Sequence, residues 1–81
     1  MTPELSKRLK KITPKEGGVD LSFNQSSSPQ GKFGSSLILK ILEKTEKGLM
    51  ISSSIQLGAI SDSLEEANVK ALDSALTLLG V

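Results

Sequence analysis

The C-terminal segment, residues 63–81, constrains the fold of this chain more than any other stretch. Small residues recur there every four positions among leucines, at Ala67, Ala71 and Ala75. Side chains four residues apart lie on one face of an α-helix, and alanines at that spacing let a neighbouring element approach closely. The segment predicts an amphipathic helix that opens with a capping box, Ser63 to Glu66, ends at Gly80 and packs on a small sheet.

A second, shorter helix is predicted near the N-terminus. Thr2 and Pro3 are typical of a helix start, and the residue before Pro14 avoids helical angles. One stripe of this helix is aliphatic, with Leu5, Leu9 and Ile12 at helical spacing. The rest of its circumference carries the basic residues Lys7, Arg8, Lys10 and Lys11.

Between the helices, three stretches alternate apolar and polar residues with the period of a half-buried strand. They cover residues 19–24, 33–42 and 49–57, with a loop at 25–31 and a charged turn at 43–48. Short connections favour an antiparallel meander. The prediction is one α+β domain over residues 1–81, in the order αβββα, with both helices on one face of the sheet.

The other face of that sheet is predicted to be rich in hydroxyl and amide groups. Its polar members are Ser22, Asn24, Lys40, Ser52, Ser54 and Gln56. The middle strand is apolar on both faces, which predicts that Ile38 and Leu42 are exposed in a monomer. A homodimer or a partner protein would cover them.

Composition removes several classes of function. The chain has no cysteine and no histidine, which excludes thiol chemistry, structural zinc and Ser-His-Asp arrangements. The carboxylates do not form a persuasive acid–base pair, so no enzyme activity, metal or cofactor is expected. No apolar run has the ~18 residues of a membrane span. The expectation is a cytoplasmic protein without a membrane segment.

The basic helix is the best functional lead. The net charge is only +1, so attraction to nucleic acid requires an uneven distribution of charge. The predicted nucleic-acid-binding residues are Lys7, Arg8, Lys10, Lys11, Lys15, Gln30 and Lys32. The competing interpretation is a solvated helix face that maintains solubility. The alternative function is a protein-interaction adaptor or inhibitor, of phage or plasmid type, that forms a homodimer.

One polar residue of the C-terminal helix falls within its apolar arc. Asn68 either finds a polar partner at the sheet margin or takes part in binding.

Two family resemblances follow from these features. The spacing of Ser63, Glu66 and the three alanines, with the αβββα order, resembles the double-stranded-RNA-binding domain. That resemblance implies RNA contacts from the first helix and from the first inter-strand loop. At the start of the second helix, where the family carries positive charge, this chain has Asp62 and Glu65. The meander followed by an Ala-Leu-rich helix is also similar to the core of single-strand annealing proteins, which are usually longer and work as rings.

Overall fold

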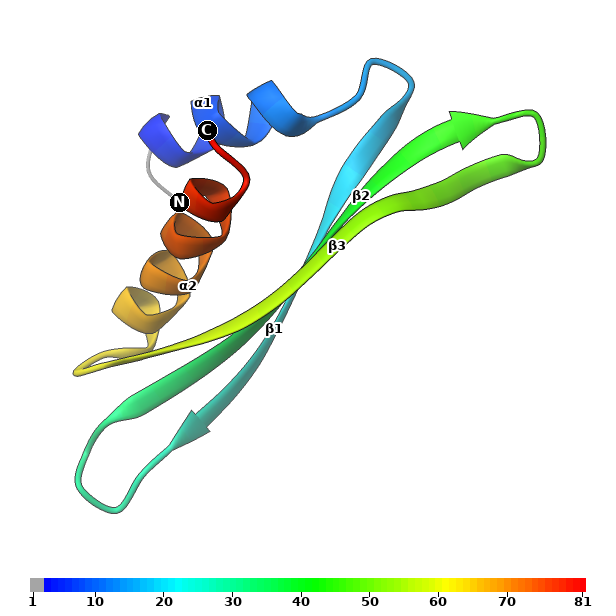
Figure 1. Cartoon of the computed structure of the whole chain (residues 1–81). Coiled ribbons are helices and arrows are strands. Elements are labelled where there is room, and N and C mark those ends of the chain that lie inside the picture. Colours follow the sequence, from blue (N-terminus) through cyan, green and yellow to red (C-terminus); the bar gives the residue numbers. More distant parts are fainter. Residues whose placement is uncertain (1–2) are drawn as a thin grey trace.

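The computed structural model describes residues 3–81 as two helices and a three-stranded antiparallel sheet (Figure 1). The elements follow the predicted order: α1 (Pro3–Ile12), β1 (Gly17–Ser27), β2 (Phe33–Thr45), β3 (Gly48–Ser61) and α2 (Leu64–Leu78). The sheet order is β1-β2-β3, so β2 is central and the other two strands are edges. The predicted α+β class is confirmed.

Helix α2 is bounded by the residues that the capping pattern indicated. The backbone N–H of Glu66 donates to the Ser63 hydroxyl at 3.2 Å, which satisfies one of the free N–H groups of the first turn. The Glu66 carboxylate accepts from the Ser61 hydroxyl at 2.7 Å and so joins the helix to the end of β3. At the other end Gly80 adopts φ of 81°, a conformation that glycine enters without Cβ strain.

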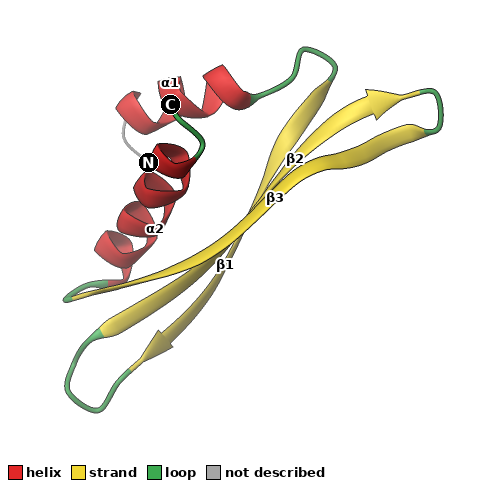
Figure 2. Cartoon of the chain, in the orientation of Figure 1, coloured by secondary structure: helices red, strands yellow, loops and turns green. Residues whose placement is uncertain are grey.

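The core lies between α2 and one face of the sheet, with α1 closing it from the side (Figure 2). Helix α2 covers β2 and β3, and Leu76 is fully buried beside Leu37 and Leu39 of the central strand. Helix α1 contributes its predicted stripe to the same core: Leu5 is buried, and Leu9 and Ile12 are half-buried against it. Both helices therefore serve one aliphatic core.

All three strands extend beyond the predicted ranges. Residues 58–61, which follow the predicted strand 49–57, continue β3, and Ser61 pairs with Phe33. Gly17, which precedes the predicted strand 19–24, begins β1 opposite Glu43. A Cβ at Gly17 would lie 2.0 Å from the carbonyl oxygen of Leu42, so the close pairing at this end of the sheet requires glycine.

A β-bulge in β3 changes which of its residues face the helices. Ile41 pairs with Ser53, but Leu42 pairs with Ile51, which leaves Ser52 as the extra residue. Ile51 and Leu49 therefore share the outer face with Leu42. The predicted regular alternation over residues 49–57 is therefore wrong, because the inserted residue reverses it, and Ile55 and Leu57 lie on the core face instead.

The exposed apolar side chains also differ from expectation. Ile38 and Leu42 are half-buried rather than exposed, since strands flank them on both sides. Beside the bulge, Leu49 at 62% and Ile51 at 57% are more exposed than Ile38 and Leu42. Leu78, in the final turn of α2, is 70% exposed.

Candidate nucleic-acid interface

Three lysines of α1 form a cationic face that is turned away from the core. Lys7, Lys10 and Lys11 are exposed, and they lie on the side of α1 opposite its buried Leu5 stripe. Of the two ion pairs in residues 3–81, neither involves these lysines. We call Lys7, Lys10 and Lys11 the α1 lysine face. Its ammonium groups are available to an anionic ligand.

Arg8, predicted as a fourth member of this surface, is occupied within the chain. Its guanidinium donates to the Val81 carbonyl oxygen from Nε at 2.9 Å and from Nη2 at 2.7 Å. It also donates to the Thr77 hydroxyl at 3.1 Å and forms an ion pair with Asp73. Only 17% of the side chain is exposed. Arg8 fixes α1 to the C-terminal end of α2, so its role in the structure is to hold the α1 lysine face in place.

Lys15 lies close to this surface in the sequence, three residues after the end of α1. It is exposed in the turn that joins α1 to β1. The neighbouring residue, Glu16, accepts a backbone hydrogen bond from Lys44 at 2.7 Å, which ties the turn to β2. Lys15 therefore lies between α1 and the part of the sheet that contains Lys44, with its side chain exposed.

Gln30 and Lys32 are not brought to α1. They lie in the β1–β2 hairpin, at the end of the sheet remote from α1 in Figure 1. Strand β1 separates the two regions, and its 11 residues span roughly 33 Å at the usual rise of a strand. Lys32 pairs with Asp62, and this hydrogen bond and charge lower the pKa of the Asp62 carboxyl. The seven predicted residues therefore do not make one continuous patch.

Charge is distributed unevenly along the chain, which the small net charge conceals. Nine of the ten basic residues precede Gly48, and four of the nine acidic residues follow it. Those four lie at the start of α2 or along it: Asp62, Glu65, Glu66 and Asp73. The first half of the chain, which includes α1, is the cationic half.

Asn68 has a structural explanation. Its Oδ1 accepts a hydrogen bond from the hydroxyl of Ser35 at 2.6 Å and a longer one from Gln25 at 3.3 Å. Ser35 is buried in β2, where its hydroxyl requires a partner. Ser35 is not among the site residues predicted from the sequence. Its place on the core-facing side of the central strand, where a hydroxyl needs a partner, is the feature of the sequence that indicates such a bond.

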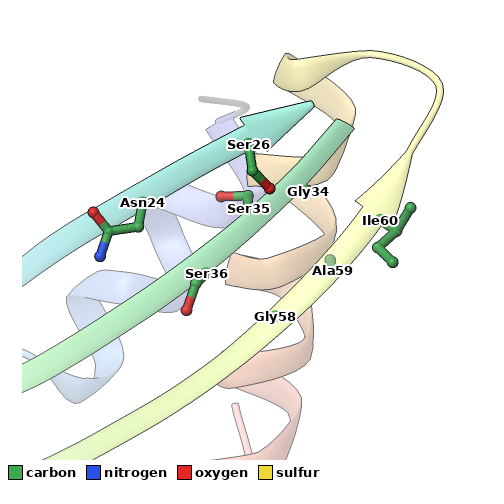
Figure 3. Close-up of a pocket in the computed structure, with 8 residues that line it drawn as sticks. All are labelled: Asn24, Ser26, Gly34, Ser35, Ser36, Gly58, Ala59 and Ile60. Carbon is green, nitrogen blue, oxygen red and sulfur yellow. The ribbon is translucent and has the colours of Figure 1, made fainter. Parts of the chain in front are cut away.

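A second feature of the surface is a hollow of about 490 Å³ on the outer face of the sheet (Figure 3). It is bordered by Asn24 of β1, Ser36 of β2 and Ile60 of β3, and it is floored by glycines 34 and 58. A Cβ at Gly58 would meet only the Ser35 carbonyl oxygen, at 3.5 Å, an ordinary contact. The hollow arises from short side chains and holds no charged group.

Among residues 3–81 there is no cluster of acidic residues that would hold a metal ion, and no helix has the length and apolar character needed to cross a membrane. Comparison with family models, with curated proteins and with solved structures gave no significant match.

Proposed function

We propose that this protein is a nucleic-acid-binding accessory protein that contacts the phosphate backbone through the α1 lysine face. The observation that carries the proposal is the exposure of Lys7, Lys10 and Lys11 on one side of a helix that Arg8 anchors to α2. An anchored helix presents its ammonium groups with less loss of conformational freedom on binding. Phosphates that meet lysines release counterions, which supplies affinity without base contacts.

The side chains available favour backbone contacts over base stacking. Phe23 and Phe33 are the only aromatic residues, and both are half-buried. Single-strand binding usually relies on exposed rings on which bases stack. The α1 lysine face is therefore better suited to a duplex, whose phosphates follow a regular path, than to an unstacked strand.

The β1–β2 hairpin is proposed as a second, weaker contact. Gln30 and Lys32 lie roughly 33 Å from the start of β1, so a ligand that touches both regions must be long. Lys32 would have to exchange Asp62 for a phosphate. Binding to both regions predicts that affinity increases with duplex length until the ligand spans the sheet, whereas contact with α1 alone predicts little dependence.

The test is fluorescence anisotropy with labelled double-stranded RNA, double-stranded DNA and single strands across a series of salt concentrations. Three phosphate contacts on B-DNA would give a slope of log K against log salt of about −2.7. The triple variant Lys7→Gln/Lys10→Gln/Lys11→Gln should lose affinity for each ligand that binds, and the magnitude of its slope should fall by about 2.7.

A matched control removes the same charge elsewhere. The variant Lys44→Gln/Lys47→Gln/Lys70→Gln neutralises three exposed lysines outside α1. It should retain most of the affinity and the salt slope. Equal losses in the two variants would mean that only overall charge matters, and the proposed interface would be abandoned. No binding of the unmodified protein at low salt would overturn the proposal altogether.

A protein-interaction adaptor or inhibitor is the second candidate. The observation in its favour is the exposed apolar group beside the bulge, Leu49 and Ile51, on a face that no helix covers. Failure of nucleic-acid binding together with binding of a protein through this face would favour the second candidate.

A further inference from the structure

The geometry points to a homodimer in which β3 of one copy pairs antiparallel with β3 of a second copy. Strand β3 is an edge of the sheet, so within residues 3–81 one side of its backbone has no partner strand. Its 14 residues, Gly48–Ser61, include no charged residue and no proline. Proteins normally protect long edge strands with such residues, and an edge without them tends to pair with another strand. The opposite edge, β1, carries Asp20.

The bulge determines which residues of β3 project to the outer face of the sheet in the two halves of the strand. Leu49 and Ile51 precede the bulge and lie on the outer face, opposite Lys44 and Leu42 of β2. After the bulge, Ser54 lies on that same face, opposite Lys40. Bulges often bend an edge away from pairing. Here the bulge leaves the pattern of faces symmetric about the midpoint between Ser52 and Ser53.

A two-fold axis at that midpoint gives a register in which every opposed pair shares a face. Ile51 lies opposite Ser54 of the second copy, and Leu49 lies opposite its Gln56. On the helix-facing side, Met50 lies opposite Ile55. Antiparallel pairing requires that opposed residues project to the same face, and a two-fold axis makes each contact occur twice. An axis at Ser53 itself would place Ile51 opposite Ile55, which lie on different faces.

The part of the sheet under the helices and the part without a helix would also lie side by side in the dimer. The β2–β3 hairpin projects beyond the helices in Figure 1, whereas Ile55 and Leu57 lie in the part of β3 packed against the core. Antiparallel pairing sets the bare hairpin of each copy beside the covered part of the other. The two helical layers then lie at opposite ends of one six-stranded sheet and do not compete for space.

This arrangement explains two exposed apolar side chains on the helix-facing side. Met50 is 52% exposed and pairs with Glu43, on the face that carries the core. Leu78 lies on the same stripe of α2 as Ala71, seven residues earlier. The other side of α2, with Val69 and Leu72, borders a cavity next to Phe23 of β1, so the stripe with Leu78 faces β3. Met50 of the second copy would enter beside this stripe.

The occupant is therefore a second copy of the chain. A charge-free edge accepts many strands, but the symmetric faces and the placement of Met50 fit this strand in particular. The dimer is compatible with nucleic-acid binding, because the α1 lysine face does not include β3 residues. Its test is independent of nucleic acid.

Sedimentation velocity over a range of protein concentrations tests the dimer directly. The unmodified protein should shift from monomer to dimer as concentration rises. Met50→Lys and Ile51→Lys each place an ammonium group within the proposed β3–β3 contact. Both side chains are exposed in the monomer, so the monomer should fold as before. Circular dichroism and thermal melting check this. Each should weaken the dimer by about tenfold or more.

Ile60→Lys is the matched control. Ile60 lies on the same strand and is 70% exposed, but in the proposed register it is beyond the turn of the second copy's hairpin. Ile60→Lys should leave the dissociation constant of the dimer unchanged. A strict monomer at all concentrations overturns the proposal, and so does a dimer that Ile60→Lys weakens as much as Met50→Lys does.

Cross-linking tests the register. The chain has no native cysteine, so a single introduced thiol reports its own position. Ser53→Cys lies next to the axis and should give a covalent dimer with a short bis-maleimide reagent. Gln56→Cys would be separated from its counterpart by seven residues of strand, roughly 23 Å, and should remain monomeric. The reverse pattern would exclude this register and overturn the proposed pairing.

Discussion

The guanidinium of Arg8 donates two hydrogen bonds, at 2.9 and 2.7 Å, to the carbonyl oxygen of Val81. The two residues are 73 positions apart, so this contact joins α1 to the residues that follow α2. A planar guanidinium can donate several hydrogen bonds in fixed directions, and here it also reaches Thr77 and Asp73. The position of α1, and with it the α1 lysine face, depends on this one side chain.

Replacement of Arg8 should therefore destabilise the fold. Arg8→Ala removes hydrogen bonds from a charged donor, and we expect a loss of about 1–3 kcal/mol in the free energy of unfolding. Arg8→Lys keeps the charge but cannot reproduce the fork of donors, so it should recover only part of this loss. Urea unfolding followed by circular dichroism measures both.

Lys7→Ala is the control for Arg8→Ala. Lys7 is on the same helix and exposed, and its replacement should change stability by no more than about 0.5 kcal/mol. Equal stability of the Arg8→Ala protein and the unmodified protein would show that Arg8 does not anchor α1. In that case Arg8 would return to the set of residues available for phosphate.

The hydrogen bond between Ser35 and Asn68 gives a second prediction about stability. Asn68→Ala leaves the buried Ser35 hydroxyl without its acceptor, which should cost about 1–3 kcal/mol. Ser35→Ala removes the buried hydroxyl itself and leaves Asn68 bonded to Gln25, so it should cost less. The double variant should be more stable than the sum of the two single effects implies.

Thermal unfolding of the four proteins in this double-mutant cycle measures the coupling. Strictly additive effects would contradict the structural role given to Asn68 and would reopen the possibility that it serves in binding. Ser22→Ala is a suitable control, because Ser22 is an exposed serine on the outer face of the sheet.

Local features of this fold were predictable from sequence, and contacts between distant residues were not. The start of α2 at Ser63 and its end at Gly80 follow from residues within one turn of each boundary. The bulge at Ser52 has no local signal, because it depends on how β3 aligns with β2. Arg8 resembled a solvated residue within a basic run because Asp73 and Val81 lie far away in the sequence.

The ion pair of Lys32 and Asp62 predicts a pH effect confined to acid conditions. The hydrogen bond from Lys32 and its charge lower the pKa of Asp62 in the folded protein below its ordinary value, with a smaller effect of Lys70. A lowered folded pKa stabilises the protein above the unfolded value, about 3.9, and this contribution is lost as the pH falls through the folded pKa. Because both side chains are largely exposed, the effect on stability should be small, and the better measurement is NMR titration of the Asp62 carboxyl carbon.

Lys32→Gln should raise the pKa of Asp62 toward its ordinary value, whereas Lys70→Gln should move it less. An Asp62 titration that is the same in the Lys32→Gln and unmodified proteins would show that the pair does not persist in solution, and Lys32 would then be free to meet a phosphate at the hairpin.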